Sequence, residues 1–361
     1  MRTKVLFLMD KLTTGGAEIY FTTIENNVNK NQIDMYTAAG PGELYDRLKN
    51  KDKFKFLSRK NHLINIYHIV RILLTNNIKV VHANCLRIAL YMVVIKLFFW
   101  NVKVMYTKHN VTMLEKKPKL FSFILNTFVD KIITVSNFEK DNLLNLGVKE
   151  EKIRTIYNGV ELEKFEYHMP VDHTRIINIG ILARLSEEKN HSLFLDTALL
   201  LKQNSNRPIK YYIAGDGPER KNIETFIKEN GLRDDVVLLG NVSDPDRFLQ
   251  EMDILLLTSK REVFPMTIIE AMAKGTPVVS INVGGIREAI QDDVNGYLVN
   301  APLPSEFSTK IEMLLMSYDK RLDFSRRSRS RVEQEFTLQF MLDAICEEYQ
   351  EMDYRLSTRR I

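Results

Sequence analysis

Residues 253–279, DILLLTSKREVFPMTIIEAMAKGTPVV, contain the pattern that decides the fold. The run Ile254–Leu257 is short and apolar, which is typical of a strand buried on both faces. A helix is predicted from about Pro265 to Lys274, because proline suits the first turn of a helix and Gly275 suits its end. A second apolar run starts at Val278, so the stretch predicts one strand–helix–strand unit of a parallel sheet.

Two carboxylates flank the start of this predicted helix. Glu262 falls in the loop before the helix, and Glu270 falls in its second turn. A helix that begins at the carboxyl end of a parallel strand points its free N–H groups and its positive dipole end into the crevice where open α/β sheets bind ligands. Phosphate is favoured there, whereas carboxylates repel it. We therefore expect the two glutamates to bind hydroxyl groups, one on a sugar ring and one on a ribose diol.

Two cations follow another predicted strand, at residues 175–182. Arg184 and Lys189 lie five residues apart in the loop before a helix that begins near His191. A guanidinium fork and an ammonium group so placed can neutralise a diphosphate from two sides and stabilise it as a leaving group. For this pair alone, two solvated loop charges are an equally good interpretation.

In order and spacing, these runs resemble those of glycosyltransferase family 4, which has the GT-B fold. The resemblance covers nearly the whole chain and includes several further motifs: Gly15-Gly16-Ala-Glu18, Val-Ser136-Asn137, Asn158-Gly159-Val160, Gly215-Asp-Gly217-Pro218 and Gly284-Gly285-Ile-Arg-Glu288. It implies an α/β fold of two Rossmann-like domains whose parallel sheets face a central cleft. It also implies a retaining transferase that takes a sugar from a nucleotide-diphosphate donor, and it favours bacterial surface polysaccharides such as capsule or O-antigen.

The resemblance assigns roles to individual positions. Arg184 and Lys189 would contact the donor diphosphate, Glu262 the transferred sugar and Glu270 the ribose. His109 falls where the family places a histidine near the reacting sugar. The implied catalytic residues are therefore Glu262, His109, Arg184 and Lys189, and the remaining donor-binding positions are Gly15, Gly16, Phe264, Pro265, Met266 and Glu270.

This chain departs from the family pattern around Phe264. The family often has glycines on both sides of this phenylalanine, whereas here Val263 and Pro265 flank it. Proline has no N–H group, so fewer backbone donors are expected near the donor sugar. The identity of the sugar, the nucleotide base and the acceptor does not follow from the sequence.

The chain length of 361 residues fits two domains. We expect an acceptor-binding domain over residues 1–168, a donor-binding domain over 169–337, and a C-terminal helix over 338–361 that crosses back to the first domain. Alternating strands and helices predict parallel sheets. Besides 175–182, 254–257 and 278–280, strands are expected at residues 4–9, 35–38, 80–82, 102–107, 131–135, 209–214, 236–239 and 297–299.

Positive charge is concentrated in the first half of the chain. Residues 1–170 hold 26 Lys and Arg against 16 Asp and Glu, and no acidic residue lies between Asp52 and Glu115. Lys116, Lys117 and Lys119 precede an apolar helical run at 120–125. We expect peripheral attachment to the anionic cytoplasmic face of the membrane, where a lipid-linked acceptor would be found. The alternative is a solvated basic surface beside a buried core helix. No nucleic-acid-binding motif is present.

Several other classes are disfavoured. The apolar stretch 88–100 is too short for a membrane span and is interrupted by Lys96, so we expect a buried helix. No signal peptide is recognisable, which predicts a cytoplasmic enzyme. Asp244-Pro-Asp246 is expected to make a turn and a helix cap, and no metal or other cofactor is expected. The run Gly215-Asp-Gly217-Pro218 lacks the third glycine of the dinucleotide-binding fingerprint, which disfavours a nucleotide-dependent oxidoreductase. A non-enzymatic sugar-binding or scaffold protein stays an alternative.

Overall fold

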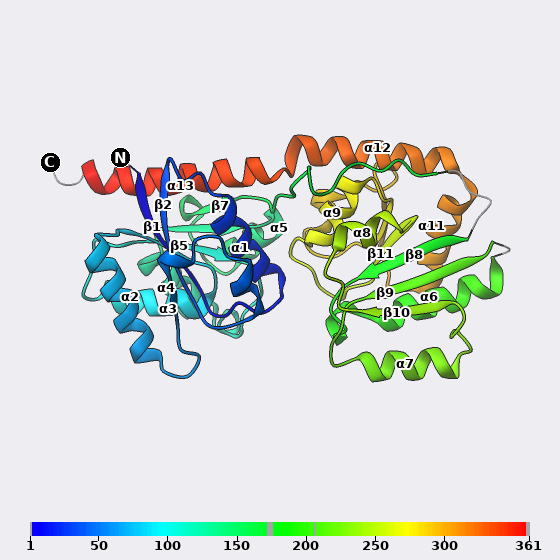
Figure 1. Ribbon diagram of the computed structural model, residues 1–361, viewed down its shortest axis with the longest axis horizontal. Coiled ribbons are helices and arrows are strands. Elements are labelled where there is room, and N and C mark those ends of the chain that lie inside the picture. Colours follow the sequence, from blue (N-terminus) through cyan, green and yellow to red (C-terminus); the bar gives the residue numbers. More distant parts are fainter. Residues whose placement is uncertain (1, 172–175, 206, 359–361) are drawn as a thin grey trace. The chain divides into compact units, whose positions relative to one another are not determined.

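The computed structural model describes residues 2–171, 176–205 and 207–358. Residue 175, the first of the strand expected at 175–182, lies outside the described residues. Two compact units make up the molecule (Figure 1). Unit 1 contains Met1–Asn158 and Gln339–Ile361, and unit 2 contains Gly159–Leu338. The expected α/β class with two parallel sheets is confirmed.

Unit 1 contains a parallel sheet of seven strands in the order β3-β2-β1-β4-β5-β6-β7. The strands are β1 (Thr3–Met9), β2 (Ile33–Ala39), β3 (Phe54–Phe56), β4 (Val80–Ala83), β5 (Lys103–Lys108), β6 (Lys131–Thr134) and β7 (Ile153–Thr155). The sequence patterns missed β3 and β7, which have three residues each. Because the chain runs from β1 outward to β3 and then returns to β4 on the other side of β1, the order reverses between β1 and β4.

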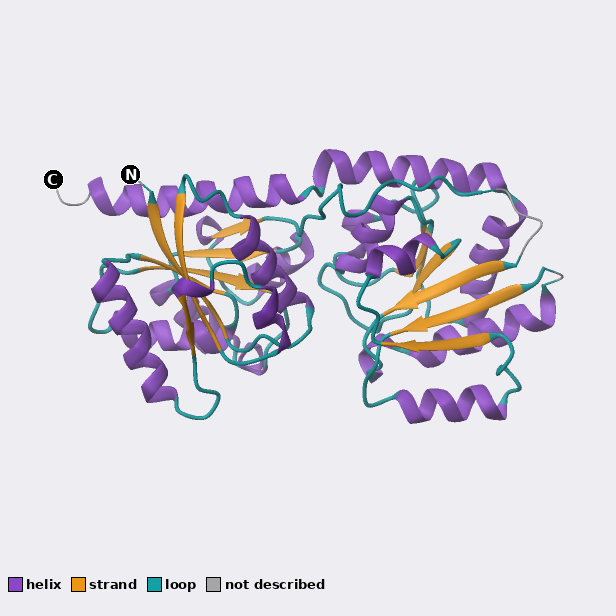
Figure 2. Cartoon of the chain, in the orientation of Figure 1, coloured by secondary structure: helices purple, strands orange, loops and turns teal. Residues whose placement is uncertain are grey.

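The helices of unit 1 cover both faces of this sheet (Figure 2). They are α1 (Gly16–Asn27), α2 (His62–Asn76), α3 (Leu86–Lys96), α4 (Pro118–Phe128), α5 (Asn137–Asn145) and α13 (Leu338–Thr358). Helices α2 to α5 share one core with alternate strand residues such as Leu6, Val81 and Val104. Short 3-10 turns lie at Glu43–Arg47, Lys51–Lys53, Met113–Lys116 and Glu150–Lys152.

The other face of the sheet packs against α1 and α13. The ring of Phe7 in β1 lies 4.4 Å from that of Phe21 in α1 and 4.5 Å from that of His82 in β4. His82 is fully buried, and its two ring nitrogens bond Tyr349 Oη of α13 and Thr107 Oγ1, each at 2.6 Å. The last helix of the chain is thus part of the core of unit 1.

Unit 2 contains a parallel sheet of six strands in the order β10-β9-β8-β11-β12-β13. Its strands are β8 (Ile177–Leu182), β9 (Ile209–Ala214), β10 (Val236–Gly240), β11 (Ile254–Leu257), β12 (Val278–Ile281) and β13 (Tyr297–Val299). Its helices are α6 (His191–Asn204), α7 (Arg220–Glu229), α8 (Pro245–Gln250), α9 (Met266–Lys274), α10 (Ile286–Ala289), α11 (Pro304–Met316) and α12 (Tyr318–Glu335), with a 3-10 turn at Glu187–Lys189. Here the order reverses between β8 and β11.

The apolar stretch 88–100 corrects one expectation. It forms most of α3 and the turn after it. Only one side of the helix is buried: Ile88, Met92 and Ile95 are in the core, whereas Leu90 and Val94 are 38% and 41% exposed. Phe98 and Trp100, in the turn, are 78% and 61% exposed. Because the stretch is apolar throughout except for Lys96, its sequence does not show which side is exposed. Among the described residues, no helix is long and apolar enough to span a membrane.

Candidate functional site

The sequence-predicted residues of unit 2 lie at the point where its strand order reverses. Arg184 and Lys189 follow β8, and Glu262 follows β11, which pairs in parallel with β8. In open α/β sheets, ligands bind outside the carboxyl ends of the strands at such a reversal. The fold therefore places these three residues on the two loops that border the expected ligand position.

The loop that carries Arg184 is locked to the loop after β9. Leu185 N donates to Asp216 O at 3.1 Å. Gly215 has φ +140°, and a Cβ there would lie 2.0 Å from Ala183 O, so only glycine fits. Arg184 is exposed, and its guanidinium group has no hydrogen-bond or ion-pair partner within the described ranges. A free guanidinium on a fixed loop is suited to bind an anion.

Lys189 and Glu262 contact each other directly. Lys189 Nζ lies 2.6 Å from Glu262 Oε1, and the Thr258 hydroxyl donates to Lys189 O at 3.1 Å. The Glu262 side chain is only 9% exposed, whereas that of Lys189 is 26% exposed. An ammonium group has three N–H donors, so this contact leaves Lys189 two donors for a further acceptor.

The loop around Glu262 is held by the paired glycines after β12. Gly285 N donates to Val263 O at 3.1 Å. Gly284 has φ +60°, and a Cβ on it would lie 1.7 Å from Glu262 O. The Gly284-Gly285 motif thus has a structural role: it allows the two backbones to approach closely enough to fix the position of Glu262.

Helix α9 begins directly after this loop, with Pro265 as its N-cap residue and Met266 as its first residue. Phe264 is buried and its ring lies 5.4 Å from that of Phe336. The first turn of α9 contains no acidic side chain, so its positive end is not compensated within the helix.

Glu270, further along α9, is half-buried. Burial raises the pKa of its carboxyl group to about 7, an effect that the nearby positive charge of Lys164 opposes. No described residue donates a hydrogen bond to this carboxyl group. Its capacity as an acceptor is therefore unused.

In unit 1, the predicted residues also gather at the strand-order reversal. Gly15 and Gly16 begin α1, which follows β1. Asn84, directly after β4, donates from Nδ2 to Ala17 O at 2.8 Å, and its Oδ1 lies 2.8 Å from Nε2 of His109. One asparagine thus connects the glycine loop to the histidine at the end of β5.

His109 is half-buried, and Tyr20 packs edge-on against it with ring centroids 4.6 Å apart. Burial lowers the pKa of its imidazole to about 3, so the ring is neutral at physiological pH. A neutral imidazole can donate or accept one hydrogen bond but does not attract a diphosphate by charge.

Sequence reasoning missed a buried ionic contact beside His109. Lys108 and Glu139 are both fully buried and form an ion pair, and Glu115 Oε2 lies 3.3 Å from Lys108 Nζ. These contacts hold the end of β5 to the start of α5. Since Lys108 and Glu139 are 31 residues apart, no local pattern links them.

His191 was also missed as a residue of interest. It is the first residue of α6, is buried, and neither of its ring nitrogens has a hydrogen-bond partner among the described residues. Burial, together with the charge of Lys189, lowers its pKa to about 4. The only sequence signal for it is its place two residues after Lys189.

The Asp-x-Asp motif has the structural role that was predicted. Asp244 caps α8 by accepting a hydrogen bond from Arg247 N at 3.3 Å, and Asp246 pairs with Lys274 at 2.7 Å. In the described part of the chain, no cluster of three or more His, Cys, Asp or Glu is placed to hold a metal ion.

Comparison with known proteins adds two family matches. Residues 14–164 match "Glycosyltransferase Family 4", and residues 172–331 match "Glycosyl transferases group 1". CapH of Staphylococcus aureus, a capsular polysaccharide biosynthesis glycosyltransferase, is 24% identical over 89% of this chain and 93% of its own. AmsK of Erwinia amylovora, an amylovoran biosynthesis glycosyltransferase, is 33% identical over 46% of this chain and 43% of its own.

The fold is shared with solved structures. HepE of Anabaena, crystallised with UDP and glucose, superposes with a TM-score of 0.84 over 97% of this chain and 100% of its own, at 19% sequence identity. At that identity the likeness concerns the fold.

Proposed function

Since the chain belongs to glycosyltransferase family 4 and has the GT-B fold, we propose that it transfers a sugar from a nucleotide-diphosphate donor to a saccharide acceptor in the synthesis of a bacterial surface polysaccharide. Unit 2 binds the donor and unit 1 binds the acceptor. The observation that carries this proposal is the Lys189–Glu262 contact of 2.6 Å at the strand-order reversal of unit 2. It joins a phosphate-binding cation to a hydroxyl-binding carboxylate.

The proposed donor contacts follow from the charges. Arg184, Lys189 and the start of α9 bind the diphosphate, Glu262 binds the sugar hydroxyls, and Glu270 binds the ribose diol. In unit 2, the backbone around Phe264, Pro265 and Met266 lies beside the sugar. In unit 1, Gly15 and Gly16 are the proposed donor-binding residues.

We propose that the transfer retains the anomeric configuration. The acceptor hydroxyl forms a bond to the anomeric carbon on the face from which the diphosphate departs, through an oxocarbenium-like state. The bond between that carbon and the phosphate oxygen breaks, and this oxygen takes the hydroxyl proton. In unit 2, Glu262 orients the sugar, and Arg184 and Lys189 stabilise the charge that develops on the diphosphate. In unit 1, neutral His109 is the proposed catalytic residue.

Metal independence is part of the proposal, since the cations and the helix start already supply positive charge to the diphosphate. Activity should therefore persist in EDTA. Loss of activity with rescue by magnesium or manganese would contradict it.

The donor is tested by measuring thermal stabilisation with a panel of nucleotide-sugars and then assaying the hits for hydrolysis. A protein stabilised by none of them would not be this enzyme.

We further propose that unit 1 attaches to the inner face of the cell membrane, where it meets a lipid-linked acceptor. Helices α2, α3 and α4 carry no Asp or Glu. Large apolar side chains are exposed on these helices and in the turn after α3, among them Leu63, Tyr67, Phe98, Trp100 and Phe123. Apolar groups beside lysines favour an anionic bilayer surface, with each basic residue near it adding about 1 kcal/mol.

Cosedimentation with phosphatidylglycerol vesicles tests this attachment. We expect binding at low salt that weakens severalfold in Phe98→Ser and Trp100→Ser. Met316→Ser, which removes an 80%-exposed apolar side chain from unit 2, serves as the matched control and should bind like the wild type. Absence of binding at low salt, or equal loss in the control, would exclude this membrane face.

A further inference from the structure

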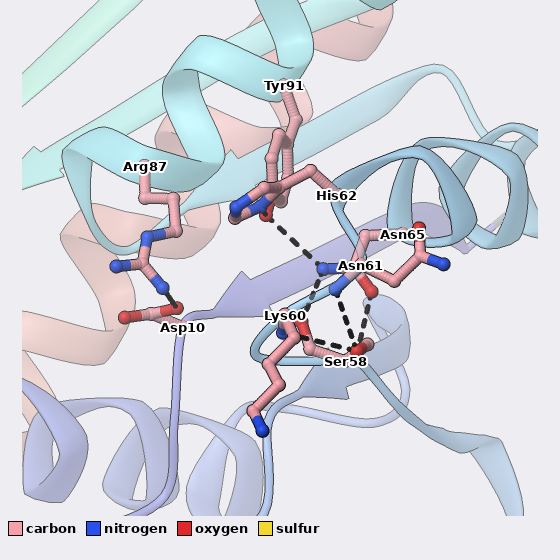
Figure 3. Close-up of polar contacts among 8 residues, drawn as sticks. All are labelled: Asp10, Ser58, Lys60, Asn61, His62, Asn65, Arg87 and Tyr91. Carbon is pink, nitrogen blue, oxygen red and sulfur yellow. Dashed lines mark hydrogen bonds and ion pairs between the residues drawn. The ribbon is translucent and has the colours of Figure 1, made fainter.

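An ion pair spans the strand-order reversal of unit 1. Asp10 follows β1, and Arg87 is the second residue of α3, the helix that follows β4. Arg87 Nη1 lies 2.8 Å from Asp10 Oδ1 (Figure 3). Because α/β sheets bind ligands at this reversal, the pair stands where a ligand of unit 1 is expected. The contact uses one of the five N–H donors of Arg87.

A second arginine lies beside the same aspartate. Gly40, at the end of β2, donates from its N–H to Asp10 O at 3.1 Å. The position of a Cβ on Gly40 would be 2.4 Å from Asp10 O and 3.5 Å from Cγ of Arg59. The stem of Arg59 therefore lies over Gly40, next to Asp10. Neither Arg59 nor the adjacent Lys60 has a side-chain partner in the parts of unit 1 that are described.

The loop that carries Arg59 is fixed by a buried asparagine (Figure 3). Asn65 accepts from Ser58 N and donates to Ser58 O, each at 2.7 Å, and it also donates to Tyr91 Oη at 3.2 Å. Ser58 Oγ accepts from Asn61 N at 3.0 Å. Because the loop is already ordered, binding at Arg59 would not incur the entropy cost of fixing the backbone.

The electrostatic balance at this edge is positive. Helices α2 and α3 both begin here, and neither has an acidic residue in its first turn. The carboxylates of Asp10, Glu18 and Glu43 supply three negative charges. Four positive charges stand against them, on Lys11, Arg59, Lys60 and Arg87. A neutral sugar gains little from this field, whereas a carboxylate or phosphate gains charge-assisted hydrogen bonds from guanidinium forks.

We propose that Arg59 and Arg87 form a subsite for an anionic group, a sugar carboxylate or a phosphate, on the acceptor. Lys60 adds charge at its rim. This inference rests on the proposed function, since it concerns the acceptor of the same reaction. It specifies an acidic saccharide or a sugar phosphate and disfavours a neutral sugar chain.

The test measures binding of matched sugars in the presence of a saturating nucleoside diphosphate, the one that corresponds to the nucleotide-sugar that stabilises the protein, so that the donor site is occupied. Glucuronic acid is compared with glucose, and N-acetylglucosamine 1-phosphate with N-acetylglucosamine; the two pairs distinguish a carboxylate from a phosphate. We expect one anionic sugar to bind at least about tenfold more tightly than its neutral counterpart, or roughly 1.4 kcal/mol. Equal binding within both pairs, or no binding, would overturn the subsite.

Variants locate the effect. Arg59→Gln should weaken binding of the preferred anionic sugar about tenfold, and Arg59 has no ion pair in the described structure whose loss would disturb the fold. Arg71→Gln, on the exposed surface of α2, makes the same change of charge and should leave binding unchanged. Equal effects of both variants would indicate general electrostatic attraction and exclude the subsite. Affinity for UDP, GDP, ADP and dTDP reports separately on the proposed function: its absence for all four in the wild type would refute that function whatever the sugars do.

Discussion

The carboxyl group of Glu270 should make donor binding depend on pH. Its pKa is raised to about 7, chiefly by burial, while Lys164 acts in the opposite direction. If Glu270 accepts hydrogen bonds from the ribose diol, the ionised form binds the donor and the protonated form must first release its proton. Affinity should therefore fall as the pH falls through about 7.

The size of the effect follows from the titration. With a pKa of about 7 in the free protein, the carboxylate is about nine-tenths ionised at about pH 8 and about one-tenth ionised at about pH 6. The Kd should thus rise about tenfold over this interval, which corresponds to roughly 1.4 kcal/mol.

Isothermal titration calorimetry with a stabilising nucleotide-sugar measures this change. A nucleotide-sugar is preferable to the free diphosphate, because a terminal phosphate titrates near pH 6 itself. Glu270→Gln should bind more weakly at about pH 8 and show a nearly flat profile. Glu251→Gln, at the exposed end of α8, should follow the wild type. A wild-type Kd that changes less than about twofold, or the same slope in Glu270→Gln, would refute the reasoning.

Three further outcomes are expected. Glu262→Gln should lower kcat by orders of magnitude with the Tm nearly unchanged, whereas Lys260→Gln, which loses only a surface ion pair, should retain turnover; near-normal turnover in Glu262→Gln would make the assigned site untenable. Glu139→Gln should lower the free energy of unfolding in urea by about 3–5 kcal/mol, because it removes the fully buried partner of Lys108 and leaves that charge only its longer contact with Glu115, and adding Lys108→Met should recover much of this loss; a singly substituted protein as stable as the wild type would mean that the pair is not buried in solution. Burial lowers the pKa of His82 from 6.5 to about 3, so the unfolded chain binds a proton that the folded chain excludes. The free energy of unfolding should therefore fall as the pH drops from about 6.5 towards 3. His82→Gln should flatten that slope, and an unchanged slope in the variant would mean that His82 is not the group responsible.

Local patterns in the sequence predicted the elements around the donor site closely. Strand β11 occupies Ile254–Leu257 as expected, and α9 starts one residue after Pro265, which serves as its N-cap. These features follow from short-range causes: a run of apolar residues that two covering layers bury, a proline that suits a helix start, and Gly275, whose positive φ ends the helix.

Long-range contacts could not be predicted in the same way. Lys189 and Glu262 were each expected to face a ligand, but their direct contact joins loops 73 residues apart and depends on β8 and β11 being neighbours in the sheet. Strand β3 was not predicted because Phe54–Phe56 is short, follows three charged residues and contains Lys55. The exposed side of α3 was missed because an apolar surface that faces outward has the same composition as one in a core.

The position of α13 bears on the order in which the protein acquires its structure during synthesis. The sheet of unit 1 is complete by β7, but the hydrogen bond between Tyr349 and buried His82 must wait until α13 has been made and has left the ribosome. All of unit 2 is made in between, so the nascent unit 1 carries an uncovered apolar surface throughout that interval. Deleting the last 20 or so residues should therefore promote aggregation through the part of the chain that is made first.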